Sequence, residues 1–303
     1  MKNLPPFVVL LAALGFAVSC AGTPPPLPAP PAPPAPEALP PPPPLPAPPA
    51  PPPDTDGPVL TVKLAPKFFS PDGDGVDDTL TITLNARDAG SGIGDWNFEI
   101  REPQPPYLLF YQWSGAGIPH SALTWGGLSA EGELVQSASD YPYTFTAADT
   151  SGNSSTAEGV IEVDVLVIRD GDVLRVQVPS IVFGSNSGGF EGLDSEIIAS
   201  NDWILRRIAL VLNKFNTYQV KVEGHANPTV NPANKAAAQQ EQDRELQPLS
   251  EQRAQAVVDY LALLGVSRER LTAFGIGGAR TIVPYNDKDN WWKNRRVEFI
   301  LVR

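Results

Sequence analysis

The feature that most constrains this chain is a proline-rich stretch at residues 24–53. About two-thirds of its residues are proline, and alanine and leucine make up most of the rest. Proline donates no backbone hydrogen bond and has a fixed φ, so the stretch cannot build a packed core. We expect a disordered linker over residues 21–57 whose proline-rich part is a semi-rigid polyproline II spacer, reaching roughly 90 Å at ~3.1 Å per residue. The alternative is a ligand for proline-recognising domains.

Residues 1–20 have the pattern of an export signal. Lys2 gives a positive start, and the apolar run at 7–16 is too short to span a bilayer. The run leads into Ala-Val-Ser-Cys at 17–20, which resembles a bacterial lipobox with Ala17 where leucine is usual. The resemblance implies lipid attachment at Cys20, the only cysteine in the chain. The alternative is an ordinary secretory signal peptide with an incidental cysteine.

Residues 58–165 show short runs in which apolar and polar residues alternate, without a helical period. Turn residues separate the runs. This pattern predicts an all-β domain built as an antiparallel sandwich. The clearest runs are LTVKL at 60–64, LTITL at 80–84, WNFEI at 96–100, YPYTF at 141–145 and VIEVDV at 160–165.

Two groups of motifs in this region are similar to those of Ig-like modules in bacterial surface and flagellar-hook-cap proteins. FSPDGDGVDD at 69–78 resembles the entry motif of these modules. WGG at 125–127, DYPY at 140–143 and DTSGN at 149–153 together resemble their closing hairpin. The resemblance implies an Ig-like sandwich and says little about function.

The entry motif holds four carboxylates within seven residues. Neighbouring negative charges need a cation or backbone amides to compensate them, and hard oxygen ligands favour Ca²⁺. The spacing is not that of an EF-hand, because Val76 stands at the fifth position and no glutamate closes the loop. The alternative is an Asp-Gly turn before a strand that starts at Thr79. The candidate ligands are Asp72, Asp74, Asp77 and Asp78.

The sequence pattern changes after residue 165. Over residues 166–303 it predicts an α+β domain, a mixed sheet with helices on one face. Apolar residues at helical spacing predict helices over 195–213 and 250–264, the second ended by Gly265. Alternating residues predict strands that include 218–222, 271–274 and 297–302.

Charge differs sharply between the two predicted domains. Residues 58–165 hold 15 Asp and Glu against 4 Lys and Arg, whereas residues 166–303 hold 16 against 17. Nearly all of the net charge of −12 therefore belongs to the predicted sandwich. An acidic chain of this kind does not favour nucleic acid or anionic lipid headgroups as partners.

Four short motifs in residues 166–303 occur in the same order in the OmpA-like family of peptidoglycan-binding domains. Pro284 and Asn286 also fall between the last two motifs, as they do in the family. The resemblance implies an OmpA-like fold whose ligand is the diamino-acid end of the peptidoglycan stem peptide, which carries an ammonium and a carboxylate. The motifs are VEGHAN at 222–227, LSEQRA at 249–254, GIG at 275–277 and NRRVE at 294–298.

The resemblance also implies the residues of the site. Arg253 falls at the family's carboxylate-binding position, and a planar guanidinium can donate two parallel hydrogen bonds to a carboxylate. Asn227 falls where the family has an acid, and loss of that charge would weaken binding roughly tenfold to a hundredfold. The other candidate peptidoglycan-binding residues are Gly224, His225, Ala226, Arg295 and Arg296.

Two observations keep alternatives open at this site. The segment between Asn227 and Leu249 is about twice the family's usual length, and an acid within it could supply the missing charge. These acids are Glu241, Asp243 and Glu245. His225 also fits a hydrogen-bonded structural residue at a strand end, and with His120 as the only other histidine no zinc cluster is visible.

The expected function is a non-enzymatic lipoprotein of the cell envelope, held by its lipid in the outer membrane and facing the periplasm. It would bind peptidoglycan non-covalently and so tether the membrane to the cell wall. The alternative is a protein-binding adaptor or scaffold, with an envelope protein as partner, whose wall binding is weak or lost. An enzyme is not indicated, because the sequence has no Gly-x-Ser-x-Gly, nucleophilic cysteine, phosphate loop or paired catalytic carboxylates in context. No cofactor is expected apart from the candidate calcium ion.

Overall fold

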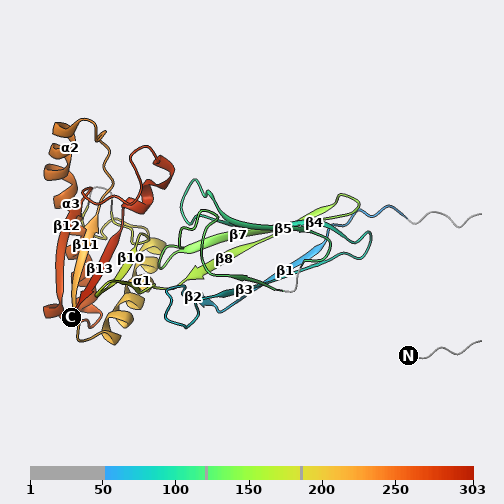
Figure 1. Ribbon diagram of the computed structural model, residues 1–303, viewed down its shortest axis with the longest axis horizontal. Coiled ribbons are helices and arrows are strands. Elements are labelled where there is room, and N and C mark those ends of the chain that lie inside the picture. Colours follow the sequence, from blue (N-terminus) through green and yellow to red (C-terminus); the bar gives the residue numbers. More distant parts are fainter. Residues whose placement is uncertain (1–51, 120–121, 185–186) are drawn as a thin grey trace, which may run out of the picture. The chain divides into compact units, whose positions relative to one another are not determined.

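The computed structural model describes residues 52–119, 122–184 and 187–303 (Figure 1). Pro52–Arg303 form one compact unit that contains three sheets. The export signal, Cys20 and most of the linker lie outside the described residues, so these assignments stay predictions. Among the described residues, no helix combines the length and apolar character needed to cross a membrane.

Two of the three sheets share one hydrophobic core. In order, the three-stranded sheet consists of β1 (Val59–Ala65), β3 (Leu80–Arg87) and β6 (Leu123–Trp125). The five-stranded sheet consists of β2 (Phe68–Phe69), β8 (Ser154–Val163), β7 (Asp140–Asp149), β4 (Ile93–Arg101) and β5 (Leu109–Ala116). All neighbouring strands are antiparallel except β2 and β8.

The alternating sequence explains how these strands fill the core. Leu80, Ile82 and Leu84 of β3 are buried, because every second residue of a strand faces the same side. From the other sheet, Phe98 of β4 lies directly opposite Phe145 of β7, and both side chains are fully buried. The two inner faces therefore pack as the period-two pattern predicts.

The predicted runs fall on observed strands, but their ends differ and one long strand was not predicted. The last predicted run, at 160–165, extends two residues beyond β8, which ends at Val163. The strand that was not predicted is β5; its Phe110 is buried, and Tyr111 and Trp113 are partly buried against the same core. The Ig-like assignment of this region, which rests on motifs alone, stays a prediction.

The third sheet has the strand order β12-β11-β13-β10-β9, and the α+β prediction for this region is confirmed. Its strands are β9 (Ile168–Asp170), β10 (Val173–Val178), β11 (Gln219–His225), β12 (Leu271–Gly277) and β13 (Val297–Val302). β11 and β12 are parallel and the other pairs are antiparallel, which makes the sheet mixed. β9 starts close to the predicted boundary between 165 and 166. The division into domains at that point stays a prediction, since all three sheets belong to one compact unit.

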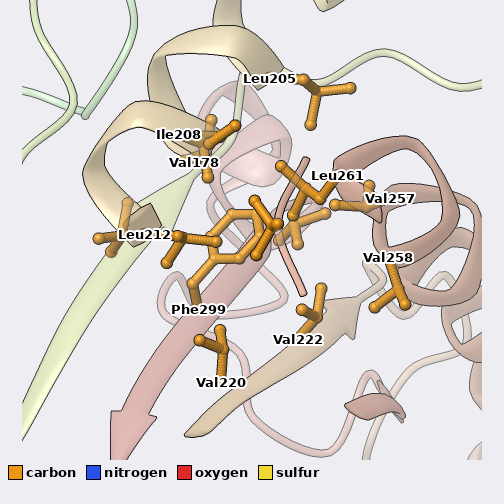
Figure 2. Packing of buried hydrophobic residues seen from close by; sticks show 14 of the residues in the cluster. Val178, Leu205, Ile208, Leu212, Val220, Val222, Val257, Val258, Leu261 and Phe299 are labelled. Atoms are coloured by element: carbon orange, nitrogen blue, oxygen red, sulfur yellow. The ribbon is translucent and has the colours of Figure 1, made fainter. Parts of the chain in front are cut away.

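Two helices, α1 (Ser195–Lys214) and α3 (Gln247–Leu263), share one core with this sheet. Figure 2 shows Phe299 of β13 among side chains from both helices and from β11. α3 is followed by Gly265 at φ +89°, the left-handed conformation that ends many helices, as predicted. The labelled side chains of the two helices are Leu205, Ile208 and Leu212 of α1 and Val257, Val258 and Leu261 of α3.

The segment between Asn227 and Leu249 contains structure that the sequence pattern did not predict. It holds α2 (Lys235–Glu241) and the π-helical turn η1 (Gln242–Leu246), which run directly into α3. α3 therefore begins three residues before the predicted start. The other short helices are the 3₁₀ turns η2 (Arg268–Arg270) and η3 (Lys288–Asn294).

Candidate functional site

A cavity of about 270 Å³ lies where three of the four OmpA-like motifs meet. β11 ends there, α3 passes beside it, and η3 leads into β13 at its edge. Five predicted residues line the cavity: Gly224, His225, Arg253, Arg295 and Arg296. Further lining residues include Ser180, Phe183, Trp292 and Gln104.

Glycines explain how α3 reaches this cavity. Gly224 of β11 and Gly275 of β12 are neighbours in the parallel pair, and α3 passes directly over them. A Cβ on Gly224 would lie 2.0 Å from the backbone oxygen of Ser250, and one on Gly275 would lie 2.5 Å from that of Gln247. Only glycine allows so close an approach. These two glycines thus set the position of α3 and of Arg253, one turn along it.

Most N–H groups of the Arg253 guanidinium have no hydrogen-bond partner among the described residues. Its guanidinium lies over the ring of Phe183 at 5.2 Å, and Nε donates to the backbone oxygen of Ser187 at 3.4 Å. Among the described residues it has no carboxylate partner. Burial and the nearby charge of Arg295 lower the pKa of Arg253. An arginine desolvated in this way is suited to bind an anionic partner, to which its N–H groups donate.

Arg295 and Arg296 directly precede β13 and differ in exposure. Arg296 is 5% exposed, and its Nε donates to Glu298 at 2.7 Å, while Arg295 is exposed. Glu298 also accepts from Arg175 at 2.6 Å. Burial would raise the pKa of Glu298, but its arginine partners hold it below the usual value. Both arginines line the cavity.

His225 is the most deeply buried of the predicted site residues, at 2% exposure. Burial and the surrounding arginines lower its pKa to about 4, so the imidazole is neutral at pH 7. Neither ring nitrogen has a hydrogen-bond partner among the described residues, which differs from the hydrogen-bonded histidine considered above.

His225, Glu223 and Glu298 are close enough together to suggest a metal site. Their potential ligand atoms lie within 4.8 Å of one another. Both carboxylates are already paired, Glu223 with Arg280 and Glu298 with Arg175 and Arg296. A divalent cation would therefore meet three positive side chains, and this cluster does not suit one.

Asn227 and Ala226 are buried, but neither is among the lining residues. Asn227 Oδ1 accepts from Asn294 Nδ2 at 2.8 Å, and its Nδ2 donates to the backbone oxygen of Pro228 at 2.9 Å. The backbone N–H of Ala226 donates to Gly277 at 2.8 Å. Both residues thus hold the loop after β11 in place.

The acids of the inserted segment do not line the cavity either. Glu241 is buried and accepts from the backbone N–H groups of Thr229 and Val230, so it caps the inserted loop. Asp243 accepts from Gln239 at 2.8 Å on the surface, and Glu245 is exposed. The alternative source of negative charge gains no support from these positions.

Lys293 is a buried charge that the sequence analysis missed. It is 2% exposed, and its Nζ lies 2.8 Å from Glu102 and 2.7 Å from Glu133. Burial alone would lower the pKa of Lys293, but the two carboxylates raise it above its ordinary value. Lys293 follows Trp292, which lines the cavity. Its partners lie 191 and 160 residues away in the sequence, so no local pattern could reveal them.

The aspartates of the entry motif accept hydrogen bonds from backbone amides. Asp78 accepts from Gly73 and Gly75, both at 2.7 Å, and Asp74 accepts from Val76 at 2.7 Å. Asp72 accepts from Val167 at 3.0 Å. Asp77 is not part of the group in which the other three come close enough to share an ion. The amides supply the compensation that a turn requires, which favours the turn interpretation, and calcium binding stays a prediction.

Comparison with known proteins identifies the family of the domain that contains the cavity. The model of the OmpA family matches residues 190–295. Over 131 residues the chain is 32% identical to the peptidoglycan-associated lipoprotein of Pseudomonas putida, covering 40% of this chain and 76% of that protein. The corresponding lipoprotein of Pseudomonas aeruginosa is 30% identical over 131 residues, with coverage of 40% and 75%. Among solved structures, the cell wall anchor of the T6SS from Pseudomonas aeruginosa is 26% identical, with a TM-score of 0.35 over 46% of this chain and 87% of that one.

The fold defines an α+β domain with a cavity beside α3. The chain belongs to the OmpA family, as its four motifs indicated.

Proposed function

We propose that this chain is an envelope lipoprotein that binds peptidoglycan without covalent chemistry and tethers a membrane to the cell wall. The observation that carries the proposal is the arginine-lined cavity at the family's motifs. Relatives named peptidoglycan-associated lipoproteins support it. The proposed role is structural, and the outer membrane, facing the periplasm, is the proposed location.

In this proposal Arg253 is the main ligand-binding residue. Its free N–H groups would bind a carboxylate of the stem peptide, while Phe183 packs against the guanidinium. Arg295 and Arg296 add positive charge beside it. Gly224 and His225 form part of the wall, and Ala226 and Asn227 hold the adjoining loop.

The second candidate function is a protein-binding adaptor. The observation that favours it is the neutral Asn227 together with the inserted α2 and η1, which give this domain additional surface. An adaptor would retain the fold and its cavity while binding an envelope protein.

The anchor rests on Cys20, and its test is a single substitution. Cys20→Ala removes the only thiol that could be acylated, so the variant should leave the membrane fraction and appear in the soluble fraction. Fractionation with detergent phase partitioning measures this. If Cys20→Ala still partitions into detergent like the parent, the chain is not lipid-anchored through this residue.

The wall-binding proposal is tested by sedimentation of the full chain with purified peptidoglycan. Arg253→Ala should weaken binding roughly tenfold to a hundredfold, because the ligand carboxylate loses a charge-assisted partner. Arg244→Ala removes an exposed arginine that does not line the cavity and is the matched control, with binding expected to stay unchanged. A parent chain that stays in the supernatant would overturn the tether and favour the adaptor.

A further inference from the structure

We propose that the cavity selects a ligand end that is anionic, a carboxylate without an accompanying ammonium group. This inference rests on the proposed function, because it names the ligand class of the same site. The lining residues include Arg253, Arg295 and Arg296 but no aspartate or glutamate. A ligand entering the cavity therefore meets three arginines and no acidic residue among the lining residues.

Two deeply buried groups beside the cavity lack hydrogen-bond partners among the described residues. Nη1 of Arg296 and both ring nitrogens of His225 have no hydrogen-bond partner among the described residues. A buried donor without a partner is unfavourable. These nitrogens are enclosed, so a carboxylate in the cavity would accept from the N–H groups of Arg253, whose Nε alone donates within the described residues, to Ser187.

The carboxylates behind the cavity are already paired with arginines. Glu298 is held by Arg175 and Arg296, and Glu223 by Arg280. Asn227 brings no charge, and its side-chain oxygen already accepts from Asn294. An ammonium group in this cavity would lose its hydration, gain no anionic partner and be repelled by the arginines. The preference for an anionic end follows from both effects.

The test compares two probes that differ in one charge, with the full chain. Both are a synthetic tripeptide that ends in meso-diaminopimelate, one with the side-chain amine free and the other with that amine acetylated. We expect the acetylated probe to bind about tenfold more tightly, since removing an unmatched charge is worth ~1.4 kcal/mol. Isothermal titration calorimetry measures both dissociation constants.

A charge variant checks that the preference arises in the cavity. Arg295→Gln removes one exposed lining arginine that has no ion-pair partner among the described residues, so the fold should persist. The affinity ratio between the probes should then fall, whereas Arg244→Gln should leave it unchanged.

Equal or tighter binding of the free-amine probe would overturn the inference and leave peptidoglycan binding standing. If neither probe binds while the chain still sediments with peptidoglycan, the ligand class is wrong. If the chain also fails to sediment, the proposed function itself is wrong.

Discussion

Replacing Lys293 with methionine is expected to lower the free energy of unfolding by about 3–5 kcal/mol. Lys293 and Glu102 are both buried, at 2% and 6% exposure, and their charged atoms lie 2.8 Å apart. Methionine fills a similar volume but leaves the Glu102 carboxylate in the interior without a cation. Breaking a buried pair by removing one partner is far more unfavourable than removing both. Urea unfolding of the full chain measures the change.

Two control variants separate buried charge from simple loss of contacts. Glu133 also pairs with Lys293, but its side chain is 42% exposed, so Glu133→Gln should lower stability by no more than about 1 kcal/mol. The double variant Lys293→Met with Glu102→Leu removes both buried charges and should recover most of the loss. If Lys293→Met is as mild as Glu133→Gln, the pair is not buried in solution.

Gly224→Ala is expected to reduce both stability and wall binding. The new Cβ would lie 2.0 Å from the backbone oxygen of Ser250, and backbone atoms cannot move aside as a flexible side chain can. α3 would have to shift away from β11, which should lower the free energy of unfolding by about 1–3 kcal/mol or more. Because Arg253 lies one turn beyond Ser250, sedimentation with peptidoglycan should fall as well.

The matched control is Gly126→Ala, at a glycine with open space around its Cβ position and without a positive φ. It should change stability by less than about 1 kcal/mol and leave binding intact. A Gly224→Ala variant that is as stable as the parent and sediments fully would show that α3 does not pack on β11 as described.

The sequence was informative wherever a local period or an ordered motif carries the signal. The helix at 195–213 differs from α1 by one residue at its end, and the strand at 297–302 matches β13 in both bounds. The motifs were enough to name the family and to single out Arg253. α2 was missed because it has no apolar period and buries only Glu241, whereas β5 was missed although its aromatic residues Tyr111 and Trp113 alternate with polar and small residues.

What only the tertiary structure decided is which side chains meet and which charges are already paired. Asn227 and Arg253 were expected at one site from their motifs, but Asn227 bonds to Asn294 and does not line the cavity, whereas Gln104, Phe183 and Trp292 do. Lys293 and its partners came together from segments 160 or more residues apart. Side-chain periodicity and motif order are local properties that follow from backbone geometry, so a sequence displays them directly. Burial and pairing of charge depend on contacts between distant segments, and these exist only after the chain has folded.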